Sequence, residues 1–374
     1  MKIVILLRIL WTGGAQKIAI QEAEELTKLG HDVELVFLRG SHFTGYSDLL
    51  RKVKFTIFSQ QGNSFLSPIY NYITKQFAPE RGNESRIDVN LLRSFWKYLI
   101  GKDIDYIICH DQFAGLAGYY AKRKLGVKYS VFMHERVFLY SIPILGWIWF
   151  KIENRVLKNA NAVFAISDRV RQSTVECHKI EVKTNLPGLD VQTEIKDFKE
   201  KEDSLISVSM WDYGRRPLVY LDVISKINNF QLYFLGNWRA PELKTQFQNA
   251  VKARGLENRV IVKSGIPEKE LISLYQRSKF CLRFGWEAGI GTSSVEAIQQ
   301  GLPLITNSDL GISSLILENS AGLVVKGIEE SDLITIKDFI KEYNNAQKYD
   351  ALRLNIIALS RKYSWKNHAM KLLV

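Results

Sequence analysis

The stretch from Arg283 to Pro303 constrains the fold of this 374-residue chain more than any other segment. It begins as an apolar strand and passes through a glycine-rich loop into a helix. The helix stops at Gly301, and a new apolar strand follows at Leu302–Thr306. A strand, a helix and a strand in this order predict part of a parallel sheet with a crossover helix. The amides at the N-terminus of that helix favour a bound phosphate, because they carry partial positive charge.

Two carboxylates flank the predicted phosphate position. Glu287 lies in the loop and Glu296 lies in the helix, with eight residues between them. Carboxylates accept hydrogen bonds from the hydroxyls of a ribose or a hexose. A phosphate with two polyols describes a nucleotide sugar, so the sequence predicts a site for one here. The alternative is a pair of solvated surface acids.

Apolar runs alternate with helical periodicity along the whole chain, and they fall into two sets. The sets meet near Asn185–Asp190, where proline, glycine and the following charge run at 196–203 are typical of a linker. We therefore predict an α/β protein of two doubly wound, Rossmann-like domains, 1–190 and 191–360, facing one another across a cleft that holds the ligands. The predicted strands are 2–8, 32–38, 106–109, 129–133, 160–167, 205–209, 231–235, 259–263, 279–283, 302–306 and 323–326. The predicted helices include 15–29, 217–227, 241–255 and 267–278.

Composition excludes several classes of protein. The apolar fraction of 46% and the charged fraction of 24% are those of a globular chain. Cys109, Cys177 and Cys281 are far apart and form no CxxC pair, so we expect neither a disulfide framework nor a zinc site, and a reducing cytoplasm fits. Since no signature of nucleic-acid binding is present, we expect no nucleic-acid partner. Residues 40–100 are less regular, and the polar patch Pro79–Arg86 suggests a loop-like insertion there.

The loop after the first strand carries Gly13 and Gly14. Glycines at this place let the backbone approach an anion at a helix N-terminus, and the alternative is a tight turn alone. The loop does not read GxGxxG, and the second strand runs into Arg39 without a following acid. A nicotinamide dinucleotide is therefore disfavoured.

Titratable residues follow two further strands of the first half. His134 comes directly after the apolar strand 129–133, and we predict that it points toward the cleft. His110 and Asp111 close the strand 106–109 in the same way. We interpret His110 and Asp111, together with Glu135, as residues of the acceptor side, and a structural role for the first two is the alternative.

Taken together, these features resemble the retaining glycosyltransferases of family 4, which adopt the two-domain GT-B fold. The Gly-Gly loop, the segment Asn185–Asp190 and the ending Tyr363–Trp365 all have counterparts in that family, so the resemblance covers nearly the whole chain. It implies that Gly13 and Gly14 lie beside the donor diphosphate. It also implies that the last helix, about 361–374, packs back on the N-terminal domain.

The most specific mark of the family is a pair of glutamates with seven residues between them, a glycine before the second and an alanine after it. In this chain an alanine follows Glu296 and Gly291 precedes it at the expected distance, but the loop has one extra residue. The resemblance implies that Glu296 binds the donor ribose and Glu287 the donor sugar. Gly291, Thr292 and Ser293 are implied to bind the donor beside them.

A second family mark is an arginine and a lysine, with four residues between them, after the first strand of the C-terminal domain. These cations neutralise the diphosphate, whose charge grows as it leaves. Arg215 matches the second position by charge, but Met210 stands where the first cation is expected. Arg216 and Arg283 are the candidates to replace it. Members of the family often have a histidine at the place of His134, where it contacts the donor sugar near the reacting carbon.

The resemblance implies an enzyme that moves a sugar from a nucleoside-diphosphate sugar to an acceptor hydroxyl, with retention of configuration and without a metal ion or other cofactor. His134 and Glu287 are then the catalytic residues that orient the sugar, and the acceptor is a glycan or a lipid-linked molecule. Two alternatives stay open, which are a nucleotide-sugar epimerase of the GT-B fold and a non-catalytic nucleotide- or glycan-binding protein of the same fold.

The segment 136–151 combines an apolar, aromatic interior with a basic residue at each end. It is too short to span a bilayer, so it either lies at a membrane interface or packs beneath the acceptor site. Residues 1–190 carry 26 Lys and Arg against 18 Asp and Glu, which favours an anionic surface as partner. We expect a cytoplasmic protein, located at the inner face of the membrane if the first interpretation holds.

Overall fold

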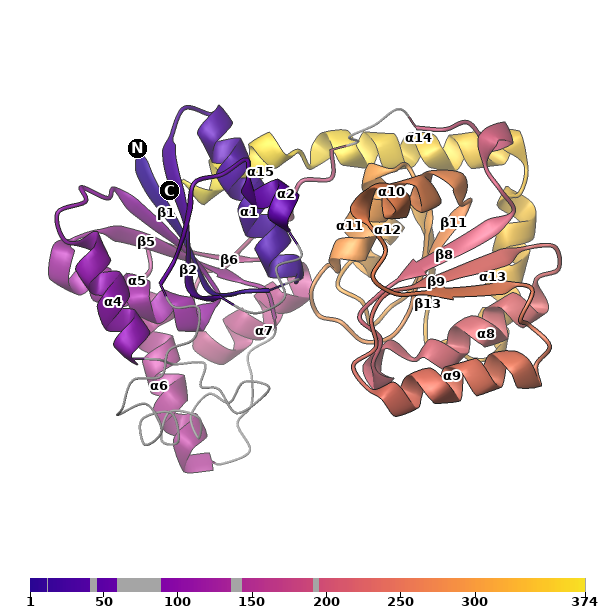
Figure 1. The fold of residues 1–374 in the computed structure, drawn as a ribbon, viewed down its shortest axis with the longest axis horizontal. Helices are drawn as coiled ribbons and strands as arrows, with labels where there is room; N and C mark the ends of the chain where they lie inside the picture. The colour runs from indigo at the N-terminus through magenta and orange to yellow at the C-terminus, as the bar shows by residue number, and fades with distance from the viewer. Residues whose placement is uncertain (12, 41–45, 59–88, 136–142, 191–194, 374) are drawn as a thin grey trace. The chain divides into compact units, whose positions relative to one another are not determined.

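The computed structural model divides into two compact units. Unit 1 is Met1–Pro187 with Trp365–Val374, and unit 2 is Gly188–Ser364. The division therefore falls inside the predicted linker Asn185–Asp190. The described residues are 1–11, 13–40, 46–58, 89–135, 143–190 and 195–373 (Figure 1). The polar patch Pro79–Arg86 and the first part of the segment 136–151 lie outside them.

Unit 1 is built on a parallel sheet of seven strands in the order β3-β2-β1-β4-β5-β6-β7 (Figure 1). Its first strand is apolar from Ile3 to Leu7, and these residues are at most 2% exposed, as expected for a sheet covered on both faces. In the register of the sheet, Ile5 lies opposite Leu35 on one side and Ile108 on the other. The strands are β1 Lys2–Leu10, β2 Asp32–Gly40, β3 Phe55–Ile57, β4 Tyr106–His110, β5 Lys128–Met133, β6 Ala162–Ala165 and β7 Lys183–Thr184.

Local sequence explains where the helix after β4 begins and ends. The side chain of Asp111 accepts hydrogen bonds from the amides of Phe113 and Ala114, which caps α5 (Gln112–Leu125). Gly126 ends the helix in the left-handed conformation, with φ of 75°. The other helices of unit 1 are α1 Gly14–Lys28, α2 Ser47–Leu50, α4 Val89–Leu99, α6 Pro143–Asn159, α7 Asp168–His178 and α15 Trp365–Leu372.

The chain's last helix belongs to unit 1, where α15 packs against α1 (Figure 1). The buried side of α1 includes Ile18, Ala23 and Leu26, which recur at the spacing of a helix face. Glu22 lies on the same side and is fully buried. A carboxylate at such a position needs partners, because burying an unpaired charge is costly.

Unit 2 is built on a parallel sheet of six strands in the order β10-β9-β8-β11-β12-β13 (Figure 1). Aromatic side chains fill one side of its core, where Trp211 stacks on Phe234 with ring centroids 3.8 Å apart. The strands are β8 Ser204–Val208, β9 Gln231–Leu235, β10 Val260–Lys263, β11 Phe280–Arg283, β12 Leu304–Asn307 and β13 Gly322–Val325. The helices are α8 Pro217–Lys226, α9 Pro241–Ala253, α10 Glu268–Arg277, α11 Thr292–Gln299, α12 Ser313–Glu318, α13 Glu330–Tyr343 and α14 Ala346–Lys362, with short 3-10 turns η2 Phe198–Glu200 and η3 Tyr213–Arg215.

The strand order of both sheets reverses once, between β1 and β4 in unit 1 and between β8 and β11 in unit 2. These sheets confirm the predicted fold of two doubly wound, Rossmann-like domains. Ligands of such sheets bind at the carboxyl ends of the strands beside the reversal. The connections that leave β1, β8 and β11 contain the predicted residues Gly13, Arg215 and Glu287, and His110 is the last residue of β4.

Candidate functional site

In unit 2, the loops that leave β8 and β11 are fastened together. The amide of Trp286 donates to the carbonyl oxygen of Gly214 at 3.0 Å. Gly285, between β11 and that contact, has φ of 115°, and a Cβ placed there would lie 2.4 Å from the Gly214 carbonyl oxygen. Only glycine fits this close approach of two backbones. The basic loop and the acid loop therefore form one surface beside the strand reversal.

Glu287 projects from this surface and is held by two arginines. Arg215 binds it with both terminal nitrogens, at 2.8 Å to Oε2 and 3.0 Å to Oε1. Arg283, whose side chain is 4% exposed, donates to Oε2 at 2.6 Å. Burial alone would raise the pKa of Glu287, but the charges of Arg283 and then Arg215 outweigh it and lower that pKa. The cluster of two cations and one carboxylate has a net charge of +1.

Arg216 and Arg283 are the two candidates for the cation that the basic loop lacks. Of the two candidates, the structure brings Arg283 to Glu287, and Ser209 Oγ fixes it by accepting from Nη1 at 2.9 Å. Arg216 takes a left-handed backbone conformation, with φ of 48°, and its guanidinium donates to the carbonyl of Gly327. The turn therefore directs the side chain of Arg216 away from the acid loop, and donor binding by Arg216 stays a prediction.

The helix α11 begins directly after the acid loop. Gly291 caps it with φ of 72°, and a Cβ placed there would lie 3.0 Å from Glu287 Oε2. The first turn, with Thr292 and Ser293, contains no acidic residue, and no side chain caps it. Glu296 lies one turn further along, half-buried, and accepts from the hydroxyl of Tyr275 at 3.4 Å. The N-terminus of α11 is thus suited to an anion, with a carboxylate on each side of it.

In unit 1, His134 follows β5 and is joined to His110 at the end of β4. Its Nε2 lies 2.8 Å from His110 Nδ1, and the two rings stack with centroids 5.0 Å apart. Burial, followed by the neighbouring His110, lowers the pKa of His134 to about 3. His134 is therefore a neutral imidazole at physiological pH, and its side chain remains partly exposed.

His110 and Asp111 are held inside unit 1. His110 is 2% exposed and uses its second nitrogen on Glu22, at 2.7 Å. Asp111 caps α5 and forms an ion pair with Arg8 at 2.6 Å. The structural alternative for these two residues fits the geometry better than the acceptor-side interpretation does. Glu135 is exposed at the end of its described segment.

A side chain on the first glycine of the Gly-Gly loop would displace two neighbouring side chains. A Cβ on Gly13 would lie 2.6 Å from Gln16 Oε1 and 2.8 Å from Trp11 Nε1. The tight turn that sequence analysis held as an alternative stays a prediction. Gly14 opens α1, whose first turn also lacks an acidic residue, so the turn and an anion site are compatible here.

Comparison with known families decides the class of protein. Residues 12–192 match the model described as Glycosyltransferase Family 4, and residues 190–351 match the model described as Glycosyl transferases group 1. The chain belongs to the family 4 glycosyltransferases. A comparison with curated proteins gives no match.

Solved structures share the GT-B fold of this glycosyltransferase. Anabaena HepE in complex with UDP is 16% identical, with a TM-score of 0.76 over 99% of this chain and 98% of that chain. Sucrose-phosphate synthase from Thermosynechococcus elongatus is 13% identical, with a TM-score of 0.73 over 99% and 97%. S. aureus TarM, a mutant in complex with Fondaparinux, alpha-GlcNAc-glycerol and UDP, is 13% identical, with a TM-score of 0.68 over 100% and 99%. At these identities the likeness concerns the fold alone.

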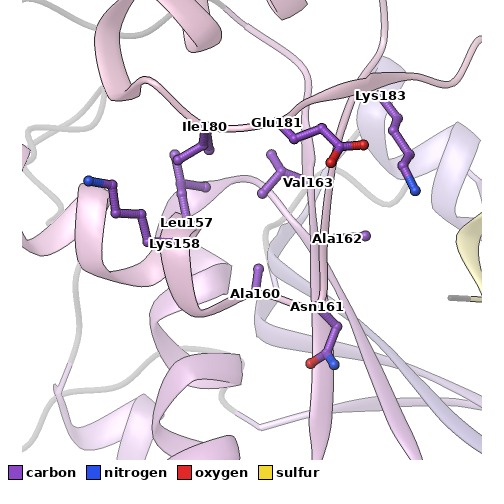
Figure 2. A pocket seen from close by; sticks show the side chains of 9 residues that line it. All are labelled: Leu157, Lys158, Ala160, Asn161, Ala162, Val163, Ile180, Glu181 and Lys183. Carbon is purple, nitrogen blue, oxygen red and sulfur yellow. The ribbon is translucent and has the colours of Figure 1, made fainter.

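The family 4 glycosyltransferase also has a hollow of about 310 Å³ in unit 1, shown in Figure 2. Its walls come from the end of α6, the start of β6 and the loop before β7, with Lys158, Glu181 and Lys183 as its charged residues. These are the amino ends of the strands. His134 follows the carboxyl end of β5, so this hollow is separate from the candidate site.

Sequence analysis of this glycosyltransferase missed two residues beside His134. Glu22 and His368 are both buried and both belong to the hydrogen-bonded group around His110. A signal for Glu22 was present, because it is a charged residue on the apolar face of an amphipathic helix. His368 similarly lies between the buried Trp365 and Leu372 of α15.

Proposed function

We propose that the protein transfers a sugar from a nucleoside-diphosphate sugar to an acceptor hydroxyl, with retention of configuration and without a metal ion. The observation that carries the proposal is the Arg215–Glu287–Arg283 cluster beside the open N-terminus of α11. An excess positive charge next to free helix amides suits a diphosphate, and a carboxylate on each side suits the sugars at its two ends. Retention is proposed from family membership.

The proposed chemistry uses these groups in sequence. The amides of α11 and the arginine pair stabilise the diphosphate as its negative charge grows on leaving. Glu296 accepts hydrogen bonds from the ribose, and Glu287 orients the transferred sugar. From unit 1, His134 contributes a neutral imidazole to the same sugar. The departing phosphate accepts the proton of the attacking acceptor hydroxyl on the same face.

We propose uridine diphosphate as the first nucleotide to test, because the HepE and TarM structures were determined with UDP. The experiment measures the melting temperature with uridine, guanosine and adenosine diphosphates and their sugars, and then analyses the products with an acceptor mixture. The expected result is stabilisation by one nucleotide series, lost in Glu296→Ala. Glu318→Ala is the matched control, since Glu318 is an exposed acid on another helix of unit 2.

Product analysis separates the open alternatives. A new glycoside indicates transfer, and an isomerised nucleotide sugar indicates an epimerase. Nucleotide binding with neither product, and without slow release of free sugar, indicates a non-catalytic binding protein. Stabilisation that is equal in Glu296→Ala and the unmodified protein would contradict the proposed donor site.

We also propose that unit 1 contacts an anionic membrane surface through α6 and that the acceptor is lipid-linked. Ile144, Trp147 and Ile148 lie on one face of α6 and are 71%, 57% and 36% exposed. The ammonium of Lys151 lies 3.6 Å from the centre of the Trp147 ring. Exposed aliphatic and aromatic side chains beside a cation are typical of helices that lie at a membrane interface. Among the helices that the structure describes, none has the length and apolar character to cross a bilayer.

A further inference from the structure

One continuous line of hydrogen bonds joins His134 to the chain's last helix. His134 Nε2 meets His110 Nδ1 at 2.8 Å, and His110 Nε2 meets Glu22 Oε2 at 2.7 Å. The other oxygen of Glu22 meets His368 Nε2 at 2.7 Å. His368 Nδ1 in turn lies 2.7 Å from the carbonyl oxygen of Leu186. The proposed function uses His134 alone, so the other members of this line have no role yet.

The line is closed to solvent except at His134. Glu22 is fully buried, and His110 and His368 are each 2% exposed. Buried polar atoms must find their partners within the protein, because an unmade hydrogen bond there is costly. Both oxygens of Glu22 and both nitrogens of each buried histidine have a partner. The geometry therefore decides where each proton resides.

Glu22 determines the direction of the hydrogen bonds in this line, because it is a carboxylate between two histidines. Burial alone would raise its pKa, but the interactions of its two oxygens with His110 and then with His368 outweigh burial and lower that pKa to about 2. An ionised carboxylate only accepts hydrogen bonds. Nε2 of His110 and Nε2 of His368 must therefore both carry a proton.

His368 therefore faces a hydrogen-bond acceptor with each of its ring nitrogens. Its Nδ1 faces the carbonyl oxygen of Leu186, which can only accept, so Nδ1 is protonated as well as Nε2. The charge of His368 then balances the charge of Glu22 inside the unit. A second cation on His110 would leave a net positive charge in the same buried place, which is unfavourable.

A neutral His110 determines the state of His134. Since His110 carries its one proton on Nε2, its Nδ1 has a lone pair and must accept from His134. His134 is therefore protonated on Nε2 and bare on Nδ1. In the part of the chain that the structure describes, His134 Nδ1 makes no hydrogen bond.

We propose that Glu22 is a positioning residue that acts through His110 to hold His134 as the neutral tautomer protonated on Nε2, so that Nδ1 accepts a hydrogen bond from a hydroxyl of the transferred sugar. The last clause rests on the proposed function, whereas the tautomer does not. His368 completes the arrangement by neutralising Glu22 from α15. The position of the last helix thereby sets which nitrogen of His134 is bare.

The tautomer is tested by nitrogen NMR of the histidine rings at neutral pH, without any substrate. We expect His134 to be protonated on Nε2 only and His368 on both nitrogens. In Glu22→Leu, where the acceptor of His110 is lost, we expect His134 to populate both tautomers. In Glu22→Gln, which preserves the shape of the side chain, we expect His368 to lose its charge. A His134 protonated on Nδ1, or a neutral His368 in the unmodified protein, would overturn the proposal.

The kinetic test compares Glu22→Leu with Glu24→Leu, since Glu24 lies on the same helix, is partly exposed and pairs with Lys28. We expect Glu22→Leu to lower kcat about tenfold, the effect of losing one hydrogen bond in the transition state. Glu24→Leu should stay within about twofold of the unmodified protein, by the same scale. Equal kcat values for the two variants at temperatures well below melting would overturn the role of Glu22. If neither the unmodified protein nor any variant turns over a donor, the proposed function fails. The NMR experiment still tests the predicted tautomer of His134, because it needs no substrate.

Discussion

Arg283 Nη2 lies 2.6 Å from Glu287 Oε2, although Arg283 ends a buried strand and Glu287 stands in a loop four residues later. The arginine is 3% exposed and is aligned by Ser209, so the loop is fastened to the end of β11 by a charged hydrogen bond. Arg215 reaches the same carboxylate from the neighbouring loop. The carboxylate of Glu287 therefore holds two arginine side chains in place, one at the end of β11 and one in the neighbouring loop.

Arg283→Met is expected to destabilise unit 2 more than Arg216→Met. Removing Arg283 leaves the carboxylate of Glu287 with one cation in a largely buried place. Breaking a buried ion pair costs about 3 kcal/mol, and we expect somewhat less here because Glu287 is partly exposed. Arg216 is exposed and donates to one carbonyl, so its loss should cost less than about 1 kcal/mol. Urea unfolding measures both values. Similar values for the two variants would show that the Arg283–Glu287 pair adds nothing.

Gly285→Ala is expected to disrupt the surface that carries Glu287. The residue has φ of 115°, and the added Cβ would lie 2.4 Å from the Gly214 carbonyl oxygen. Gly265→Ala is the matched control, because Gly265 also has a positive φ, of 67°, but its Cβ would meet nothing within 4 Å. The control should lose about 1 kcal/mol from backbone strain alone, and Gly285→Ala should lose clearly more. Thermal unfolding and donor binding report the difference, and equal losses would contradict it.

Much of the fold could be predicted from the sequence, because buried parallel strands are continuous apolar runs. The helix α5 could not, although it is 14 residues long. It contains Gly115 and Gly118, which disfavour a helix by intrinsic propensity. A Cβ on Gly118 would lie 2.7 Å from Cys109 Sγ and 2.8 Å from the Tyr129 ring, so the glycine is required where the helix meets the sheet. Packing has overridden propensity at this point.

The candidate site could be predicted only where its residues follow strands directly. His134 follows β5 directly and Glu287 stands in the loop that leaves β11, so both could be placed from the pattern of the chain. The pairing of Glu22 with His368 could not be foreseen, because it joins residues 346 positions apart. The choice between Arg283 and Arg216 depends on the left-handed turn at Arg216, which the sequence does not specify for a residue with a side chain.

The free energy of unfolding of unit 1 is expected to decrease as the pH is lowered from about 6.5 to about 3, because of His134. Its pKa is lowered from 6.5 to about 3, so in this range the unfolded chain binds a proton at this residue that the folded protein does not. The charged or titratable groups that face it are His110, Glu22 and His368. Stability from this group is present above pH 6.5 and is lost as the pH falls, by up to about 1.4 kcal/mol per pH unit. Glu22 adds a similar loss between about 4.5 and 2.

The measurement is denaturant unfolding at pH 7 and pH 4. His134→Gln, which removes the titrating group, should lose less stability between the two values than the unmodified protein does. His31→Gln is the control for loss of a histidine elsewhere in unit 1, and it should behave as the unmodified protein. A His134→Gln variant with the same loss as the control would mean that His134 titrates normally.

The different exposure of the two tryptophans of α6 leads to a testable prediction about membrane contact. Trp149 is fully buried and stacks on Phe113 with ring centroids 4.9 Å apart, whereas Trp147 is 57% exposed beside Ile144 and Ile148. The helix therefore packs on unit 1 with one side and leaves an apolar side uncovered by the described residues. Such a surface should bind vesicles that contain phosphatidylglycerol more strongly than vesicles of phosphatidylcholine, and salt should weaken the binding.

Co-sedimentation of an Ile144→Ser, Trp147→Ser double variant checks the location. We expect it to bind at least several-fold more weakly, because each apolar side chain removed from an interface loses about 1.5 kcal/mol or more. The control is Leu317→Ser with Leu354→Ser, which removes two side chains of unit 2 that are 67% and 62% exposed. If the contact were general surface hydrophobicity, both double variants would weaken binding equally. A loss confined to the α6 variant would place the lipid-facing surface on the unit that also carries His134, and would favour a lipid-linked acceptor over a free glycan.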